Sequence, residues 1–343
     1  MNTLTITLPD DAHLHVRDGH HLATTVPASS RCFGRAVIMP NLIPPVTTVP
    51  LAHAYRERIL HHIPTGYTFD PLMALYLTDH TTPLDVIVAA SNPHIIGYKL
   101  YPAGATTHSH AGVTHLEKLD AVFAAMAEHQ LPLLIHGEVT DPTIDIFARE
   151  REFIERHLIP LLQRFPTLRV VLEHITTKDA VEFVQQGPDN LAATITVHHL
   201  FYNRNAMLVG GIRPHLYCLP ILKSHRHQEV LIKAAVSGHK KFFLGTDSAP
   251  HARMKKEISC GCAGIFSAPM ALACYAEVFE QANALDQFEA FASFNMADFY
   301  GLPRNQTKIT LQKDPWIVPD HYPFGDDVVI PFRAGETLQW QVK

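Results

Sequence analysis

Short apolar runs alternate with longer stretches of helical hydrophobic spacing along most of the chain. The runs are continuous, which is typical of strands whose two faces are both covered by other elements. They predict strands within the ranges 12–18, 35–40, 67–77, 95–100, 131–136, 168–174, 191–197 and 241–247. Helical spacing or helix-start signals occupy the ranges 51–61, 81–83, 114–126, 141–160, 176–186, 227–237, 269–281 and 287–300.

This alternation occurs about eight times, which favours a closed (β/α)8 barrel. An open, doubly wound parallel sheet is the alternative, but the first strand is not followed by a glycine fingerprint for dinucleotides. There is no short internal repeat and no low-complexity linker. We therefore expect one domain over 1–343, in which the tail from residue 304 forms short β-like pieces.

Local signals add detail to this outline. Residues 102–112 are small and rich in glycine and threonine, which predicts a mobile loop. Thr114 and Glu117 have the spacing of a capping box. Asp141 begins a long helical stretch that we expect to be interrupted at Pro160.

Composition excludes several classes of protein. The net charge of −5 provides no basic field for nucleic acid. No apolar run is long enough to span a membrane. The first residues do not resemble a signal peptide, and five cysteines without a Cys-x-x-Cys pair do not suggest a disulfide framework, so we expect a cytoplasmic protein. Cys260 and Cys262 could form a soft metal pair, although unpaired thiols in a loop are the simpler interpretation.

The first predicted strand carries His13, His15 and Arg17 at alternate positions. Side chains of a strand alternate between faces, so these three point the same way. Two imidazoles on one face can share a metal ion, and the arginine can hold an anion beside it. In a chain of 24 histidines, an accidental His-x-His is the alternative.

Polar residues gather where the predicted strands end, which is where barrel enzymes carry their chemistry. Each alone is compatible with a structural role, such as a buried histidine or a helix cap. Together they are Asn41, Lys99, His136, His174, Asp247 and His251. With His13 and His15, the residues His136, His174 and Asp247 make four histidines and one aspartate, which exceed the needs of one tetrahedral zinc and suit two ions. A lysine amine that takes up carbon dioxide would supply a carbamate with one oxygen for each ion.

These residues lie in motifs that resemble the compact bacterial-type dihydroorotases of the amidohydrolase superfamily. The motifs occur in the same order from about residue 9 to the tail, and they are highly specific as a set. They are His13-Leu-His-Val-Arg-Asp-Gly19, Met39-Pro-Asn41, Gly97-Tyr-Lys-Leu-Tyr-Pro102, Ile135-His-Gly-Glu138, Glu173-His-Ile-Thr176 and Gly245-Thr-Asp-Ser-Ala-Pro-His251.

The resemblance implies a binuclear zinc centre in which a carboxylated Lys99 bridges the two ions. One zinc would be held by His13, His15 and Asp247, and the other by His136 and His174. It implies the reversible cyclisation of N-carbamoyl-L-aspartate to dihydroorotate and water, with Asp247 carrying the proton. It also implies a homodimer.

The same resemblance assigns the substrate contacts. The substrate carboxylate would be bound by Arg17, Asn41 and His251, and the ring amide by the backbone of Leu219 and Ala263. Thr106 and Thr107 would reach into the site from a loop that closes over it.

The sequence departs from the family pattern at Val197-His198-His199-Leu200, where the family more often has Pro-Gln-His-Leu. This change touches no expected ligand. Two alternatives remain at this point: another cyclic-amide hydrolase of the hydantoinase or allantoinase type, and a non-catalytic assembly homologue. Arg17 and Asn41 favour an anionic substrate over a neutral ring, and the complete set of ligand residues argues against lost catalysis.

Overall fold

The computed structural model describes residues 2–343. Eight parallel strands form one sheet in which each strand pairs with the next along the chain. They are β2 (Asp10–Leu14), β3 (Arg35–Ile38), β4 (Asp70–Tyr76), β5 (Ile95–Leu100), β6 (Leu133–Ile135), β7 (Val170–Leu172), β8 (Leu191–Ile195) and β9 (Phe242–Leu244).

The segment that follows β9 closes the sheet onto β2. The Asp247 N–H donates to the His13 carbonyl at 2.9 Å, and the His15 N–H donates to the Ser248 carbonyl at 3.1 Å. The predicted (β/α)8 barrel is confirmed, and the open sheet is wrong.

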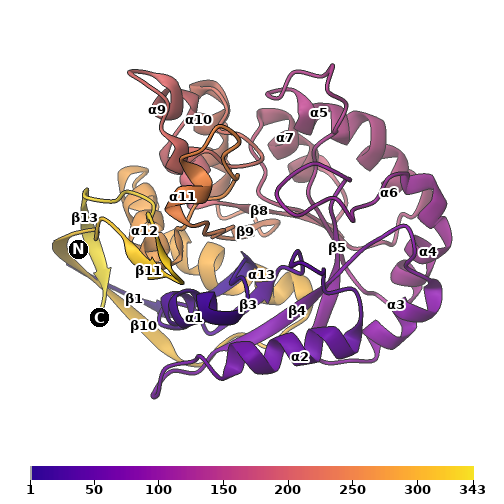
Figure 1. Cartoon of the computed structure of the whole chain (residues 1–343), viewed down its shortest axis with the longest axis horizontal. Helices are drawn as coiled ribbons and strands as arrows, with labels where there is room; N and C mark the ends of the chain where they lie inside the picture. The colour runs from indigo at the N-terminus through magenta and orange to yellow at the C-terminus, as the bar shows by residue number, and fades with distance from the viewer. Residues whose placement is uncertain (1) are drawn as a thin grey trace.

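Helices cover the outside of the barrel, and Figure 1 shows α2, α3, α4 and α6 along its periphery. The helices are α1 (Leu22–Ser30), α2 (Val49–Leu60), α3 (Pro83–Ala90), α4 (Asp120–Glu128), α5 (Arg149–Phe153), α6 (Ile159–Arg164), α7 (Lys178–Gln186), α8 (Val197–Phe201), α9 (Arg204–Leu208), α10 (His225–Ala235), α11 (Arg253–Lys256), α12 (Ala271–Gln281) and α13 (Asn295–Tyr300). Seven of the eight barrel strands lie within the predicted ranges, and β2 begins two residues earlier than predicted. The helices agree less well: several are displaced at one end by a few residues, and α1, α8, α9 and α11 were not predicted.

Alternating strand residues divide the core into two layers. In β3, Ala36 and Ile38 belong to the large cluster between strands and helices, whereas Val37 and Met39 belong to a smaller cluster inside the barrel. The inside of the barrel is therefore packed, and polar side chains find room only at its ends.

β2 contains one extra residue relative to its neighbour. Between its paired positions β2 advances over 11–14 while β3 advances over 36–38. As a result Ala12 faces the barrel interior while Leu14 packs outside. Such a bulge turns the following side chains by one position, and here it directs His15 inward.

β5 has the same kind of irregularity just before its lysine. It advances over 95–97 while β4 advances over 73–74. Ile96 packs inside the barrel and Tyr98 outside it, so Lys99 also points inward. Both strands that carry candidate ligands, His13 in β2 and Lys99 in β5, are thus re-aimed by a bulge.

A small antiparallel sheet joins the two ends of the chain in the order β1 (Thr3–Thr7), β10 (Lys308–Ile317) and β13 (Thr337–Val342). A separate hairpin is formed by β11 (Tyr322–Phe324) and β12 (Asp327–Val329). Figure 1 shows both termini beside this sheet, at the left of the view. The strand β1 was not predicted, because its partners come only from the tail.

The predicted helix start at Asp141 is wrong. The Asp141 carboxylate accepts hydrogen bonds from the backbone N–H of Thr143 (2.9 Å) and from its hydroxyl (2.7 Å). Such turns compete with helix formation, and α5 begins only at Arg149. The expected interruption near Pro160 takes the form of a π-helical turn at Ile154–Leu158.

The predicted capping box at Thr114 is also wrong. Its hydroxyl donates to Asp79 Oδ2 at 2.6 Å, and its N–H donates to Asp79 Oδ1 at 3.0 Å. The hydroxyl is therefore engaged by a neighbouring loop, and the helix α4 begins later, after a 3-10 turn at Leu116–Leu119.

Within residues 2–343, helices long and apolar enough to cross a membrane are absent.

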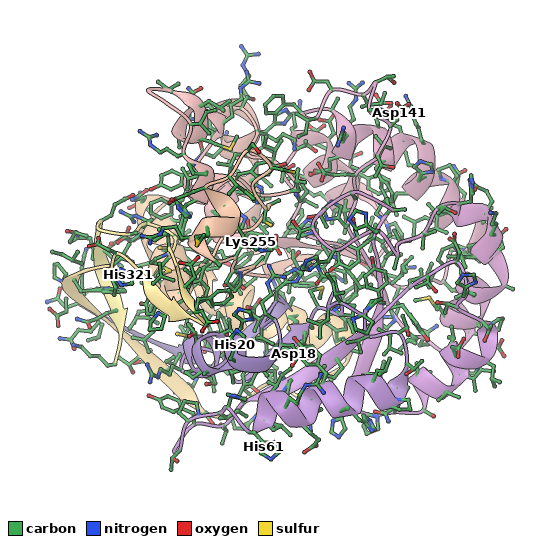
Figure 2. All side chains as sticks on the ribbon, viewed as in Figure 1. Asp18, His20, His61, Asp141, Lys255 and His321 are labelled. Atoms are coloured by element: carbon green, nitrogen blue, oxygen red, sulfur yellow. The ribbon has the colours of Figure 1, made fainter. Side chains whose placement is uncertain are left out.

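Figure 2 shows that Asp18 and His20, which follow β2, and Lys255, which follows β9, lie nearer the middle of the view than His61 or Asp141.

Candidate metal centre and active site

Three ligand atoms from β2 and from the end of β9 converge on one point. His13 Nε2 lies 3.3 Å from His15 Nε2. Asp247 Oδ1 lies 3.4 Å from the first nitrogen and 3.2 Å from the second. Metal–ligand bonds of about 2.0–2.2 Å separate tetrahedral ligand atoms by about 3.3–3.5 Å, so this triangle matches a zinc site.

The charge states of these groups also suit a metal. Burial lowers the pKa of both His13 and His15, which keeps the imidazoles neutral. Burial works against ionisation of Asp247, but the positive charge that His13, His15 and Lys99 carry when protonated outweighs it and holds the pKa of Asp247 at about 2. Neutral imidazoles and an ionised carboxylate are the forms that bind metal.

Each histidine of this group is oriented by a partner on its other ring nitrogen. His13 Nδ1 donates to Glu173 Oε2 at 2.9 Å, and His15 Nδ1 donates to Asn41 Oδ1 at 2.8 Å. Thr194 holds the same Glu173 oxygen at 2.6 Å. Hydrogen bonds of this kind leave the Nε2 lone pairs facing the shared point and raise ligand basicity.

A second group lies beside the first. The rings of His136 and His174 have centroids 4.8 Å apart, and the His174 ring lies 5.0 Å from that of His13. His136 Nε2 donates to Glu138 Oε2 at 2.8 Å. His174 Nδ1 is buried without a hydrogen-bond partner, so a lone pair or a proton there needs a ligand.

Lys99 is fully buried, and its Nζ likewise has no hydrogen-bond partner. Burial lowers the pKa of Lys99 to about 8. A buried amine without a hydrogen-bond partner is costly as it stands. The side chain therefore fits a form that carries additional atoms, as a carbamate does.

Sequence reasoning missed the two carboxylates that orient the histidines. Glu173 precedes His174 directly, and Glu138 lies two residues after His136. Strand alternation could have identified Glu138, since it places both side chains on one face. Nothing local links Glu173 to His13, because their contact spans the barrel.

Three residues at this end of the barrel have left-handed backbone: Arg17 (φ 61°), His174 (φ 41°) and Asp247 (φ 43°). This conformation costs about 1–3 kcal/mol for a residue with a side chain. Such strain is retained where the surrounding structure fixes it, and all three side chains border the same cavity.

Arg17 borders this cavity without an anionic partner. Its Nε donates to the Pro250 carbonyl at 2.8 Å, and Nη2 donates to His251 Nε2 at 3.0 Å. Burial lowers the pKa of His251, which keeps this imidazole neutral. Among the described residues, ion pairs that involve Arg17 are absent. A guanidinium so placed can accept an anion.

Loop residues cover the cavity. Thr106, Thr107, Leu219 and Ala263 border it together with the ligand residues. Asn41 Nδ2 donates to the Thr107 carbonyl at 3.3 Å, and the Thr107 hydroxyl donates to the Ala263 carbonyl at 3.5 Å. The residues that the sequence proposed for the site thus all border this cavity, except Lys99, which is fully buried behind its walls.

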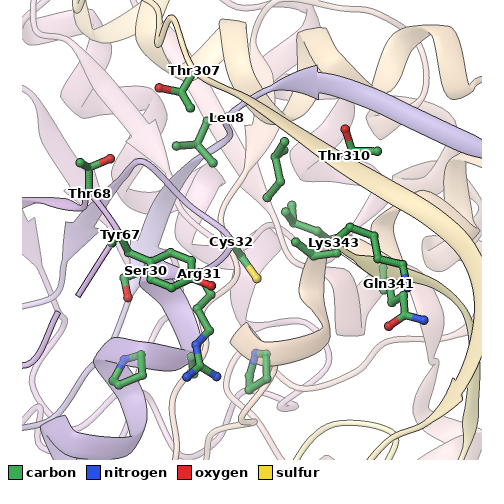
Figure 3. A pocket seen from close by; sticks show the side chains of 18 of the residues that line it. Leu8, Ser30, Arg31, Cys32, Tyr67, Thr68, Thr307, Thr310, Gln341 and Lys343 are labelled. Carbon is green, nitrogen blue, oxygen red and sulfur yellow. The ribbon is translucent and has the colours of Figure 1, made fainter. Parts of the chain in front are cut away.

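The cavity at this site is small. Its volume is about 20 Å³, which holds roughly one water-sized sphere. A larger cavity of about 1150 Å³ lies between α1 and the terminal sheet, as Figure 3 shows with Ser30, Cys32 and Thr310 on its walls. We place the chemistry in the smaller cavity, because the ligand atoms and Arg17 converge there.

Comparison with known proteins agrees with this geometry. The amidohydrolase family matches residues 6–337. A curated relative from Nitrosococcus oceani, named dihydroorotase, is 60% identical over 342 residues, which cover 100% of this chain and 99% of the relative. The chain belongs to the amidohydrolase family, among its dihydroorotases.

Solved structures support the same placement within the amidohydrolases. A dihydroorotase from Campylobacter jejuni has a TM-score of 0.92 at 38% identity and covers 100% of this chain and 98% of its own. One from Saccharomyces cerevisiae, in complex with 5-fluoroorotic acid, has a TM-score of 0.91 at 34% identity and covers 100% and 99%.

The barrel itself is shared more widely. An L-hydantoinase from Arthrobacter aurescens has a TM-score of 0.78 at 15% identity, and covers 99% of this chain and 83% of its own. At that identity the likeness concerns the fold alone. The hydantoinase likeness therefore adds nothing to the assignment, which rests on the full-length dihydroorotase relatives.

Proposed function

We propose that this chain catalyses the reversible cyclisation of N-carbamoyl-L-aspartate to dihydroorotate with release of water. Its full-length relatives are dihydroorotases, and one similar solved structure, the enzyme from Saccharomyces cerevisiae, is a complex with 5-fluoroorotic acid, a ring carboxylate. The small-molecule substrate would enter at the carboxyl ends of the barrel strands, where Arg17 and the ligand residues meet.

The donor set fits two zinc ions. His13, His15 and Asp247 would hold one ion, and His136 and His174 the other. Lys99 would bridge them after its amine has combined with carbon dioxide to form a carbamate. The unpartnered Lys99 Nζ and His174 Nδ1 support this assignment. Bound zinc would lower the pKa of water and polarise the amide carbonyl of the substrate.

Asp247 would serve as the proton carrier. Its carboxylate is ionised and lies at the centre of the ligand group, so it can accept the proton of the attacking water. It would pass that proton to the ring nitrogen that leaves when dihydroorotate opens. In the biosynthetic direction, the same carboxylate would take the proton from that nitrogen.

The environment of Arg17 is the observation that favours dihydroorotate as the substrate. A partly buried guanidinium with only a carbonyl and a neutral histidine as partners needs an anion to balance its charge. Dihydroorotate supplies a carboxylate, whereas a hydantoin or allantoin ring is neutral. Asn41 and His251 would complete the carboxylate contact, and the backbone of Leu219 and Ala263 would bind the ring amide.

Thr106 and Thr107 would close the site over the bound ring. A cavity of about 20 Å³ is too small for a ring when one water already needs about 10–15 Å³. The loop must therefore move before substrate enters, and its return would exclude water. A homodimer and a cytoplasmic location follow from the family likeness and complete the proposal.

The decisive experiment is the turnover of dihydroorotate, followed by the loss of its ultraviolet absorbance, with and without a chelator. We expect turnover that the chelator abolishes and that added Zn²⁺ restores. Metal analysis should give two zinc ions per chain. A protein that binds zinc but does not turn over dihydroorotate would instead support the non-catalytic alternative.

Arg17→Lys separates the substrate classes. A point charge cannot replace a forked guanidinium, so kcat/KM for dihydroorotate should fall by about 10- to 100-fold, within the 1.5–3 kcal/mol of a charged hydrogen bond. The matched measurement uses a ring analogue without the carboxylate. An equal loss on both substrates would contradict the proposed clamp.

A further inference from the structure

A second buried group of ligand atoms lies outside the proposed zinc centre. One ring nitrogen from each of His198 and His199 and the Sγ of Cys218 lie within 4.8 Å of one another. All three side chains are almost fully buried. In the described part of the chain, the only other group to meet this separation is His13, His15 and Asp247.

The surroundings of His198 indicate that it binds a ligand. Its exposed fraction is 0%, and neither Nδ1 nor Nε2 has a hydrogen-bond partner. Buried polar atoms are nearly always satisfied in folded proteins, so two on one ring need an explanation. No group that the proposed mechanism uses accounts for these two atoms.

The other two donors are held in place. His199 Nδ1 accepts from the Thr196 hydroxyl at 2.6 Å, and Nε2 donates to the Pro220 carbonyl at 2.9 Å. Cys218 Sγ lies 3.8 Å from that same nitrogen, and its S–H donates to the same Pro220 carbonyl at 3.4 Å. Metal–ligand bonds of about 2.0–2.3 Å place ligand atoms about 3.5 Å apart, so a small contraction brings the donors to bonding distance.

The net charge that a bound ion would leave in this buried site indicates which kind of ion fits. Lys256 places a buried ammonium beside the group, because its Nζ donates to the carbonyls of Tyr217, which directly precedes Cys218, and of Cys262 and Gly264 at 2.9, 3.1 and 2.5 Å. A divalent ion with one thiolate would leave a net positive charge buried beside this ammonium. A monovalent ion with one thiolate is neutral, which avoids the cost of a buried charge.

We propose that His198, His199 and Cys218 form a closed binding site for one soft monovalent cation of the Cu(I) class. Two imidazoles and one thiolate are ligands that such an ion favours. On binding, the Cys218 S–H bond breaks, its proton leaves to solvent, and a sulfur–metal bond forms without any change of oxidation state. The His199 imidazole changes tautomer on binding. Its Nε2 gives up its proton and binds the ion, while its Nδ1 takes up a proton and donates a hydrogen bond to the Thr196 hydroxyl.

The site is distinct from the proposed zinc centre and does not depend on the proposed activity. Two of its ligands come from α8 and the third is Cys218. None of these three residues is a proposed zinc ligand. Cys218 immediately precedes Leu219, whose backbone we assign to the substrate.

The test uses the zinc-loaded protein in a Cys260→Ser/Cys262→Ser background, because these two thiols are more exposed and would bind copper themselves. Cu(I) is added anaerobically against a chromophoric Cu(I) chelator, and zinc is measured in parallel. We expect one Cu(I) per chain with full retention of zinc. X-ray absorption should show two nitrogen neighbours and one sulfur neighbour.

Variants of the proposed ligands test whether Cu(I) binds at this position. His198→Gln and Cys218→Ser should each weaken Cu(I) binding by at least about 100-fold, since loss of a direct ligand exceeds the 10- to 100-fold cost of losing an outer partner. Cys32→Ser is the matched control, because Cys32 is also a buried free cysteine. Unchanged binding in either ligand variant, or copper bound only in exchange for zinc, would overturn the proposal. If a variant fails to fold, a wild-type absorption spectrum without a sulfur neighbour would overturn it.

Discussion

Two buried groups of three ligand atoms lie in this molecule, and they differ in what surrounds them. The group of His13, His15 and Asp247 borders a cavity that also contains Arg17. The group of His198, His199 and Cys218 borders none of the cavities described above.

The comparison shows that a ligand set alone does not define an active site. The first group combines a carboxylate with histidines that Glu173 and Asn41 orient, and it lies beside an unpartnered lysine and a guanidinium. The guanidinium can receive an anion. The second group offers a thiol and enclosed rings, which suits binding without turnover. The following changes test what distinguishes the first group.

The largest effect should come from Lys99→Ala. This change removes the only proposed link between the two metals. The second zinc should therefore be released, and nearly all activity should be lost. Lys99→Arg is the control, because a guanidinium keeps the positive charge but cannot form the carbamate, and it should not restore turnover. Zinc analysis and kinetics measure both effects, and mass analysis of the native protein should detect the carbamate. Full activity in Lys99→Ala would disprove the bridge.

Asp247→Asn should lower kcat by at least about 100-fold, in the range of general acid–base effects. The amide retains the shape of the carboxylate but cannot accept a proton. Steady-state kinetics at saturating zinc separate the proton role from the metal role. An unchanged kcat with a raised KM would show that Asp247 is a ligand only.

Glu173→Gln should weaken zinc binding about 10- to 100-fold, as expected when an outer partner of a ligand histidine loses its charge. The contact concerned is His13 Nδ1 to Glu173 Oε2 at 2.9 Å. Glu138→Gln is the matched variant for His136 and should loosen the other ion. Competition with a zinc chelator measures both affinities. If both variants hold zinc as tightly as the wild type, the carboxylates contribute to folding rather than to metal binding.

The smallest effect should come from Thr106→Ala/Thr107→Ala. These hydroxyls are not ligands, so zinc content should be unchanged. Loss of one or two hydrogen bonds to substrate should lower kcat/KM by about 5- to 150-fold, or 1–3 kcal/mol. Wild-type kinetics would contradict the closing loop, and loss of zinc would mean that the loop supports the centre instead.

The sequence by itself determined the barrel and the approximate places of its strands. Continuous apolar runs such as 95–100 and 131–136 reflect strands buried on both faces, and that pattern is local. The strand ends also located the candidate site, because chemistry in a barrel gathers there. His13, Lys99 and Asp247 could be proposed from that rule and from their motifs.

The details that depend on distant residues needed the tertiary structure. The bulge that turns β2 appears only in its register against β3. The contact of Glu173 with His13 joins residues on opposite sides of the barrel. In the same way, β1 exists as a strand because β10 supplies its hydrogen-bond partners.

The departure at His198 illustrates the same limit. In the sequence, His198 is an isolated change that touches no expected ligand. In the fold it lies beside Cys218, a residue 20 positions further along the chain, and both of its ring nitrogens are unsatisfied. Local patterns record which faces are buried, because burial follows the period of each element. They do not record which buried polar atoms meet, because that is decided when separate strands and loops pack together.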